Sequence, residues 1–330
     1  MKKILLLFVI FCFALTGCSR FHKGNVLKEF QKKFDKSSGY QLSGRLSVTN
    51  NDEVYEYDVD VSYLKDHYYK VTLTNTMNDH TQIILKNDDG VYVLTPSLNK
   101  SFRFQSDWPY QNSQIYLLDA LLRDLEKDEN RTFDVKKDTY VFKAKVHYPN
   151  NSKLAEEKVV FSKDLKPQKI IVYNDSGVEA LRMIFDKVKY SPKLDKNDFA
   201  LDEILNEDHS TILEETSILE DIIYPLFVPD GTKLVGEEKV EKTNGERIIM
   251  NYDGEKSFLL VEETADVFDE FTVIPSLGEP YLLMDTLGVM TDNSLSWSSG
   301  GVDFYLVSDV MSMEELVEVA QSISGVVSMK

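Results

Sequence analysis

The sequence predicts an α+β fold, in which a curved antiparallel sheet wrapped on helices is followed by a smaller α+β domain. Three observations favour it. The chain has 330 residues, which is enough for about two domains. Aromatic residues are plentiful, with 18 Phe and 17 Tyr, and strands favour them. Segments that alternate apolar and polar residues recur between residues 40 and 188, which is typical of strands with one buried face.

The N-terminal segment predicts an exported, lipid-anchored chain. Lys2 and Lys3 precede an uncharged apolar stretch at 4–15, which is too short for a spanning helix and typical of a signal sequence. Residues 15–18, Leu-Thr-Gly-Cys, resemble the lipobox of a bacterial lipoprotein precursor. The sequence therefore predicts a signal peptide at 1–17 and diacylglyceryl transfer to Cys18. The alternative is an ordinary secretory signal with a chance cysteine.

Lipidation would place the protein on the extracytoplasmic face of the cell membrane. The mature chain would begin at Cys18, with a tether at 18–25, and palmitate-type acyl chains would hold it at the plasma membrane. Because Cys12 would be removed with the signal peptide, no intramolecular disulfide could form.

Alternation and helical spacing predict the elements of the first domain, residues 26–200. The expected helices are 26–34 and 114–125, the second capped by Ser113. The expected strands are 40–48, 55–63, 68–74, 81–86, 90–94, 133–135, 140–148, 158–162, 168–173 and 180–188. The order predicts a long antiparallel meander with helices on its concave face.

The strand at 55–63 has the clearest pattern. Its apolar stripe faces one side, and Glu56, Asp58 and Asp60 face the other. The stripe is interpreted either as plain core or as the lining of a ligand cavity that suits acyl chains. The candidate ligand-binding residues are Tyr57, Val59, Val61, Val71 and Leu73. The acidic face is interpreted as solvated, or as meeting a basic partner or a cation.

The second domain is expected at 221–330, after a polar linker at 201–220. The acidic stretch 191–217 is read as a connector, and 271–287 as a loop-rich middle. The closing helix, 313–323, is expected to be capped by Ser312. The expected strands are 247–252, 257–262, 294–297 and 303–307.

Charge and motifs exclude several classes of function. With 37 Lys+Arg against 55 Asp+Glu, the net charge of −18 repels phosphate, so nucleic acid is not an expected partner. No two of the five histidines lie within ten residues, and nucleotide-binding and nucleophile-elbow motifs are absent, so no metal, cofactor or enzymatic activity is expected. Neighbouring acids, such as Glu214-Glu215 and Glu262-Glu263, are read as solvated.

Particular segments resemble known families. The strand, proline turn and return strand at 93–104, with Trp108-Pro109-Tyr110 and residues 114–118, resemble LolA/LolB/RseB-type proteins. Among these, residues 26–200 look most like the LolA-like sporulation and germination lipoproteins of Gram-positive bacteria. Residues 222–330 resemble a DUF4367-type domain through Pro229-Asp230-Gly231, Trp297 and Tyr305.

The resemblance implies a non-enzymatic role in the envelope. LolA-like proteins hold acyl chains inside the sheet, so the expected function is binding or scaffolding of lipid acyl chains or of an envelope protein, in sporulation, germination or envelope maintenance. The alternative is an RseB-like regulator that holds a membrane anti-sigma factor. An envelope hydrolase is a third reading.

Overall fold

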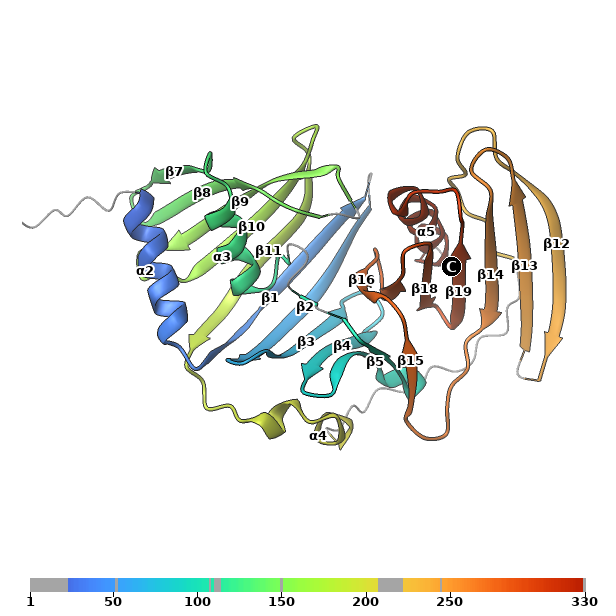
Figure 1. The fold of residues 1–330 in the computed structure, drawn as a ribbon, viewed down its shortest axis with the longest axis horizontal. Coiled ribbons are helices and arrows are strands. Elements are labelled where there is room, and N and C mark those ends of the chain that lie inside the picture. Colours follow the sequence, from blue (N-terminus) through green and yellow to red (C-terminus); the bar gives the residue numbers. More distant parts are fainter. Residues whose placement is uncertain are drawn as a thin grey trace, which may run out of the picture.

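The chain forms two sheets that lie side by side (Figure 1), and all their strand pairs but one are antiparallel in the described residues. The computed structural model describes residues 23–50, 53–106, 108–109, 114–148, 151–206, 222–243 and 245–328. Most of the ordered elements are strands and only a few are helices, as the composition predicts. In the described part of the chain, no helix is both long enough and apolar enough to cross a membrane.

The first sheet has twelve strands in the order β15-β6-β5-β4-β3-β2-β1-β11-β10-β9-β8-β7. The chain runs outward from β1 to β6, crosses one face of the sheet, and returns from β7 to β11 beside β1 (Figure 1). Every strand predicted in this half is present. They are β1 (Gly39–Asn50), β2 (Glu53–Leu64), β3 (Tyr68–Asn75), β4 (Thr81–Asn87), β5 (Gly90–Thr95), β6 (Lys100–Phe104), β7 (Thr132–Val135), β8 (Thr139–Lys145), β9 (Leu154–Ser162), β10 (Pro167–Asn174) and β11 (Glu179–Tyr190).

Strand β2 has the two faces that its alternation predicts. All five apolar residues from Tyr55 to Tyr63 are buried. On the other face, Arg45 of β1 forms ion pairs with Asp58 at 2.8 Å and Glu56 at 3.4 Å. The acidic face is therefore partly neutralised by the neighbouring strand.

Helices α2 (Lys23–Lys36) and α3 (Leu118–Lys127) cover the same face of this sheet (Figure 1). Their apolar sides join the sheet in one core: Phe30 of α2 packs on Phe161 with ring centroids 4.7 Å apart. Helix α3 begins later than predicted, with Leu117 at the N-cap and no capping side chain. Ser113 lies outside the described residues.

The connector after β11 is more structured than its polar sequence predicts. It contains a 3₁₀ turn, η2 (Lys196–Phe199), and a short helix, α4 (Leu201–Asn206). Phe199 and Ile204 are fully buried in a small cluster with Ile83, Leu85 and Tyr92. The start of the predicted linker at 201–220 is therefore a packed element, because two apolar residues find a place on the outer face of the sheet.

The second sheet has the order β12-β13-β14-β19-β18-β17-β16. Helix α5 (Met313–Ser328) packs on one face of it. Ser312 caps this helix as predicted: its hydroxyl accepts from the Glu315 N–H, and the Glu315 carboxylate accepts from the Ser312 N–H. The strands are β12 (Lys233–Lys242), β13 (Gly245–Asp253), β14 (Phe258–Thr264), β16 (Glu279–Leu282), β17 (Leu287–Met290), β18 (Ser294–Ser299) and β19 (Val302–Val307).

The stretch predicted as loop-rich, 271–287, contains strands instead. Strand β15 (Thr272–Ser276) leaves the second unit and pairs in parallel with β6 at the edge of the first sheet. Met284, Leu287 and Val289 then enter the core of the first unit. Short strands that pair with distant segments have no local signal, which is why alternation alone missed them.

Candidate functional site

The main candidate site is a cavity of about 830 Å³ where the two units meet, called the junction cavity below. One side is formed by β1, β9, β11 and the residues before α3, and the other by α5 and residues 280–287. Its volume lies in the range of small-ligand sites, roughly 300–1,000 Å³. Its lining includes the apolar residues Ile115, Leu154, Leu181, Met284, Leu287 and Val317.

Three tyrosines stand in the wall of the junction cavity: Tyr116, Tyr148 and Tyr281. Burial raises the phenol pKa of all three. The carboxyls of Glu157 and Asp124 add to the rise for Tyr148, and Glu314 adds to it for Tyr281. The three hydroxyls therefore stay protonated at neutral pH and can donate hydrogen bonds.

Two exposed apolar residues mark the mouth of the junction cavity. Leu226 is 73% exposed and Phe227 is 40% exposed, and both line the cavity. Large apolar side chains that gather at a concave surface are typical of binding sites. The sequence analysis missed them, although 222–228 is the most apolar stretch that follows the polar connector.

Carboxylates surround the same mouth. Glu314 and Glu318 of α5 bind the turn before β9: Glu314 accepts from the Ser152 N–H, and Glu318 pairs with Lys153. Glu53 accepts from the Tyr55 hydroxyl at 2.8 Å. The contacts of Glu314 and Glu318 join the second unit to the first, whereas the Glu53 contact lies within β2.

The five candidate residues predicted from the sequence lie together, but outside the junction cavity. Tyr57, Val59, Val61, Val71 and Leu73 are each at most 2% exposed and belong to the first core. None of them is among the residues that line the junction cavity. Tyr57 donates a hydrogen bond to the Met284 carbonyl oxygen at 2.7 Å, so the second unit covers this end of the stripe.

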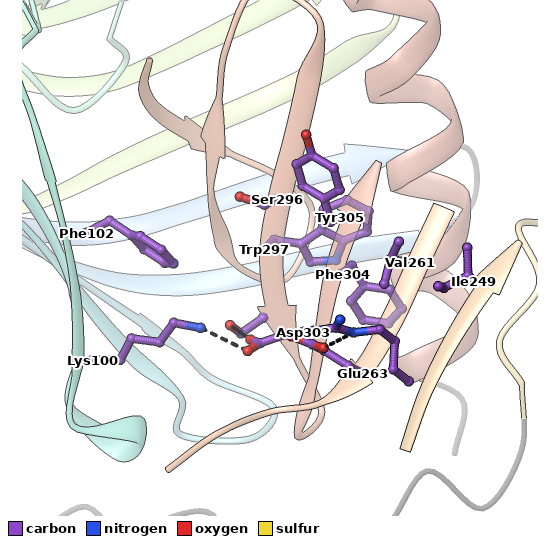
Figure 2. Close-up of a pocket in the computed structure, with 12 residues that line it drawn as sticks. Lys100, Phe102, Ile249, Val261, Glu263, Ser296, Trp297, Asp303, Phe304 and Tyr305 are labelled. Carbon is purple, nitrogen blue, oxygen red and sulfur yellow. Dashed lines mark hydrogen bonds and ion pairs between the residues drawn. The ribbon is translucent and has the colours of Figure 1, made fainter. Parts of the chain in front are cut away.

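A second, smaller hollow of about 420 Å³ lies between β6 and the face of the second sheet that α5 leaves open. Figure 2 shows its two ion pairs, Lys100–Asp303 at 2.9 Å and Arg247–Glu263 at 2.6 Å. Phe102, Ile249, Val261 and Tyr305 add apolar surface. Because the side chains of Lys100 and Asp303 are only 9% and 19% exposed, their contact fixes β6 to the second sheet.

The described residues contain no group of three His, Cys, Asp or Glu side chains that could hold a metal ion. Of the acidic pairs considered from the sequence, Glu262 is buried and accepts from the Ile223 N–H, and Glu263 pairs with Arg247 and Lys242. Cys18 and the pair Glu214-Glu215 lie outside the described residues.

Comparison with known proteins gives two matches that span most of the chain. A family model described as "Sporulation protein YdcC-like" matches residues 1–199. Sporulation protein YdcC of Bacillus subtilis is 35% identical over 316 residues, which cover 94% of this chain and 93% of that protein.

Solved structures match more distantly. The Pseudomonas aeruginosa MucA/MucB complex matches over 89% of this chain and 96% of that chain, with 11% identity and a TM-score of 0.32. A LolA superfamily protein of Nitrosomonas europaea covers 54% of this chain and 98% of its own, with 12% identity and a TM-score of 0.30. The complex of the CwlD amidase from Clostridioides difficile with the GerS lipoprotein covers 54% and 98%, with 16% identity and a TM-score of 0.28.

Proposed function

The chain belongs to the YdcC-like sporulation protein family, and from that premise we propose that it is a non-catalytic binding and scaffold protein of the cell envelope whose binding site is the junction cavity. The observation that supports this proposal is the cavity itself, whose lining includes apolar side chains, three tyrosines and the exposed residues Leu226 and Phe227. The described part of the chain offers no competing metal site.

The proposal includes a membrane anchor at Cys18 on the extracytoplasmic face. It is supported by the lipobox-like residues 15–18 and by the apolar stretch before them. The test is membrane fractionation of a Cys18→Ala variant together with labelling by a palmitate analogue. The variant is expected to leave the membrane fraction and to lose the label; complete retention at the membrane would contradict the anchor.

A role in sporulation is proposed from the family and from the relative in Bacillus subtilis.

That residues 222–330 form a DUF4367-type domain is also a proposal, and it is supported by the sequence resemblance alone. Between acyl chains and an envelope protein as the bound species, the polar side chains among the lining residues favour a protein.

The binding role can be tested by native mass spectrometry of the protein released from membranes. We expect a co-bound species that an Ala180→Trp variant loses, because Ala180 lines the cavity and an indole there would occupy part of the space that the ligand needs. Val178→Trp is the matched control, since Val178 is 57% exposed and is not a lining residue. A wild-type protein that carries nothing, under conditions in which it is folded, would contradict the proposal.

A further inference from the structure

The junction cavity has a strong excess of negative charge. Glu53, Glu314 and Glu318 line it, and among the described lining residues the one cationic side chain is Lys153. Hydrogen bonds from Ser152 hold the pKa of the Glu314 carboxyl below its usual range, so Glu314 is ionised at neutral pH. Glu318 already neutralises Lys153. Lys153 also acts on Glu314, so the three carboxylates share one cation among the described lining residues.

A buried acid lies near the cavity, close enough to act on the pKa of Tyr148, but it adds no negative charge because its carboxyl is held protonated. Glu157 is 3% exposed, and its pKa is raised well above the usual value by burial and by Asp124. Its Oε1 atom has no hydrogen-bond partner in the described structure. The same two carboxyls raise the pKa of the Tyr148 phenol. The negative potential of the cavity therefore comes from Glu53, Glu314 and Glu318 in its lining. Such a potential repels anionic headgroups and attracts cations, and the tyrosine rings offer faces for cation–π contacts.

The polar lining suits a peptide better than an acyl chain. Gln114, Asn151, Asn174 and Gln321 bring side-chain amides to the cavity, and these can pair with peptide N–H and C=O groups. A hydrocarbon chain would desolvate the amides without replacing their hydrogen bonds, which is unfavourable. Leu226 and Phe227 provide the apolar contact that such a peptide would need at its centre.

We propose that the junction cavity binds a segment of an envelope protein partner in which apolar side chains are flanked by Lys or Arg. This inference rests on the proposed function and adds the chemical class of the bound species. The apolar side chains enter between α5 and β11, and the cationic groups lie at Glu53 and Glu314.

The test uses two labelled synthetic peptides with the same Leu/Phe centre, one flanked by lysines and one by glutamates. Binding to the full-length protein in nanodiscs of zwitterionic lipid is followed by fluorescence anisotropy, with empty nanodiscs as the blank. The lysine-flanked peptide is expected to bind about tenfold more tightly or better at low ionic strength, and added salt should shrink this preference.

Two triple variants with the same change in charge locate the effect. Glu53→Gln/Glu314→Gln/Glu318→Gln should reduce the preference to about twofold or less. The control, Glu129→Gln/Glu238→Gln/Glu241→Gln, changes exposed residues that do not line the cavity and should keep the preference. Equal reduction in both variants would overturn the inference.

Other outcomes separate this inference from the proposed function. Equal or tighter binding of the glutamate-flanked peptide, or displacement of the lysine-flanked peptide by a fatty-acid carboxylate at lower concentration, would overturn the inference and leave a binding protein. The inference would also be overturned, and the proposed binding role kept, if neither peptide bound while the wild-type protein carried a co-bound species that the Ala180→Trp variant lacks. Both proposals would be contradicted only if the wild-type protein carried no co-bound species in native mass spectrometry and also bound neither peptide.

Discussion

Two apolar regions of this protein differ in what fills them. The packed stripe on β2 and β3, made of Tyr57, Val59, Val61, Val71 and Leu73, is covered by helices of its own unit and by residues 284–289 of the other. The junction cavity also has apolar side chains in its lining, but no element of the described chain fills it. An apolar stripe in a sequence therefore identifies a buried face, and it does not identify a binding site.

The difference has a physical origin. In the first unit, the side chains on one face of the sheet pack against the apolar side chains of the helices in a single core. The space there is filled to the usual density of protein interiors. At the junction, two separately folded surfaces meet. They are joined by β15, by the apolar residues Met284, Leu287 and Val289 and by polar contacts. These contacts fix the units but leave the junction cavity open beside them.

The largest expected difference between the two regions is the loss of stability when one leucine in each is truncated to alanine. Leu73→Ala should lower the free energy of unfolding by about 2–5 kcal/mol, because a fully buried side chain leaves a cavity in the core. Leu226→Ala should change it by about 0.5 kcal/mol or less, since Leu226 is 73% exposed. Denaturant unfolding of the full chain measures both.

Binding should respond in the opposite order. Leu226→Ala is expected to weaken binding at the junction cavity, and Leu73→Ala, at temperatures where it is folded, is expected to leave it unchanged. If Leu73→Ala cost little stability and abolished binding, the stripe would be a ligand site after all, and the comparison between the two regions would be reversed.

The sequence predicts the stripe well and the junction cavity not at all. Alternation is a local property, so the burial of residues 55–63 can be read from nine consecutive residues. The cavity brings together residues near 53, 115, 151, 181, 227, 281 and 318. Their proximity depends on the parallel pairing of β15 with β6, and no periodicity within either segment predicts that pairing.

The contact that holds the second unit in the first core is the next target. Gln82 is buried; its Oε1 accepts from the Leu287 N–H and the Thr286 hydroxyl, and its Nε2 donates to Thr95. Gln82→Ala would leave the Leu287 N–H buried without a partner, which should cost about 1–3 kcal/mol.

Amide hydrogen exchange measures the effect of Gln82→Ala at Leu287 and its neighbours. Amide protection is expected to fall at 283–289 in Gln82→Ala, more than in the strands of the first sheet. Gln168→Ala is the control, because Gln168 lies on the exposed side of β10. Unchanged protection would mean that the apolar side chains alone hold this segment in place.

The buried acid beside the junction cavity predicts a pH dependence. Burial, and then Asp124, raises the pKa of Glu157 in the folded state. In the unfolded chain this carboxyl ionises near its ordinary value, so unfolding releases a proton. The stability of the protein should therefore fall as pH rises above that value, by at most about 1.4 kcal/mol per pH unit for one group.

Comparison with Glu157→Gln isolates this contribution. The variant should gain stability relative to the wild type as pH rises, and the difference should become constant in acid. Glu156→Gln, on the opposite face of β9 and paired with Lys143, controls for removing one acid from the strand. A difference that does not change with pH would mean that Glu157 is ionised in the folded protein.

The smallest expected effect concerns the two helices at the edges of the site. Helix α5 has the capping box that its sequence predicts at Ser312, whereas α3 begins at Leu117 without a capping side chain and is held by the burial of its apolar face. Ser312→Ala should lower the free energy of unfolding by about 1 kcal/mol, and Ser312→Asp should restore most of it, since both Ser and Asp accept from the N–H of the first turn. Because Glu314 and Glu318 lie on the same helix, fraying of its first turn should also weaken binding at the junction cavity. A Ser312→Ala protein with wild-type stability would show that α5, like α3, depends on packing alone.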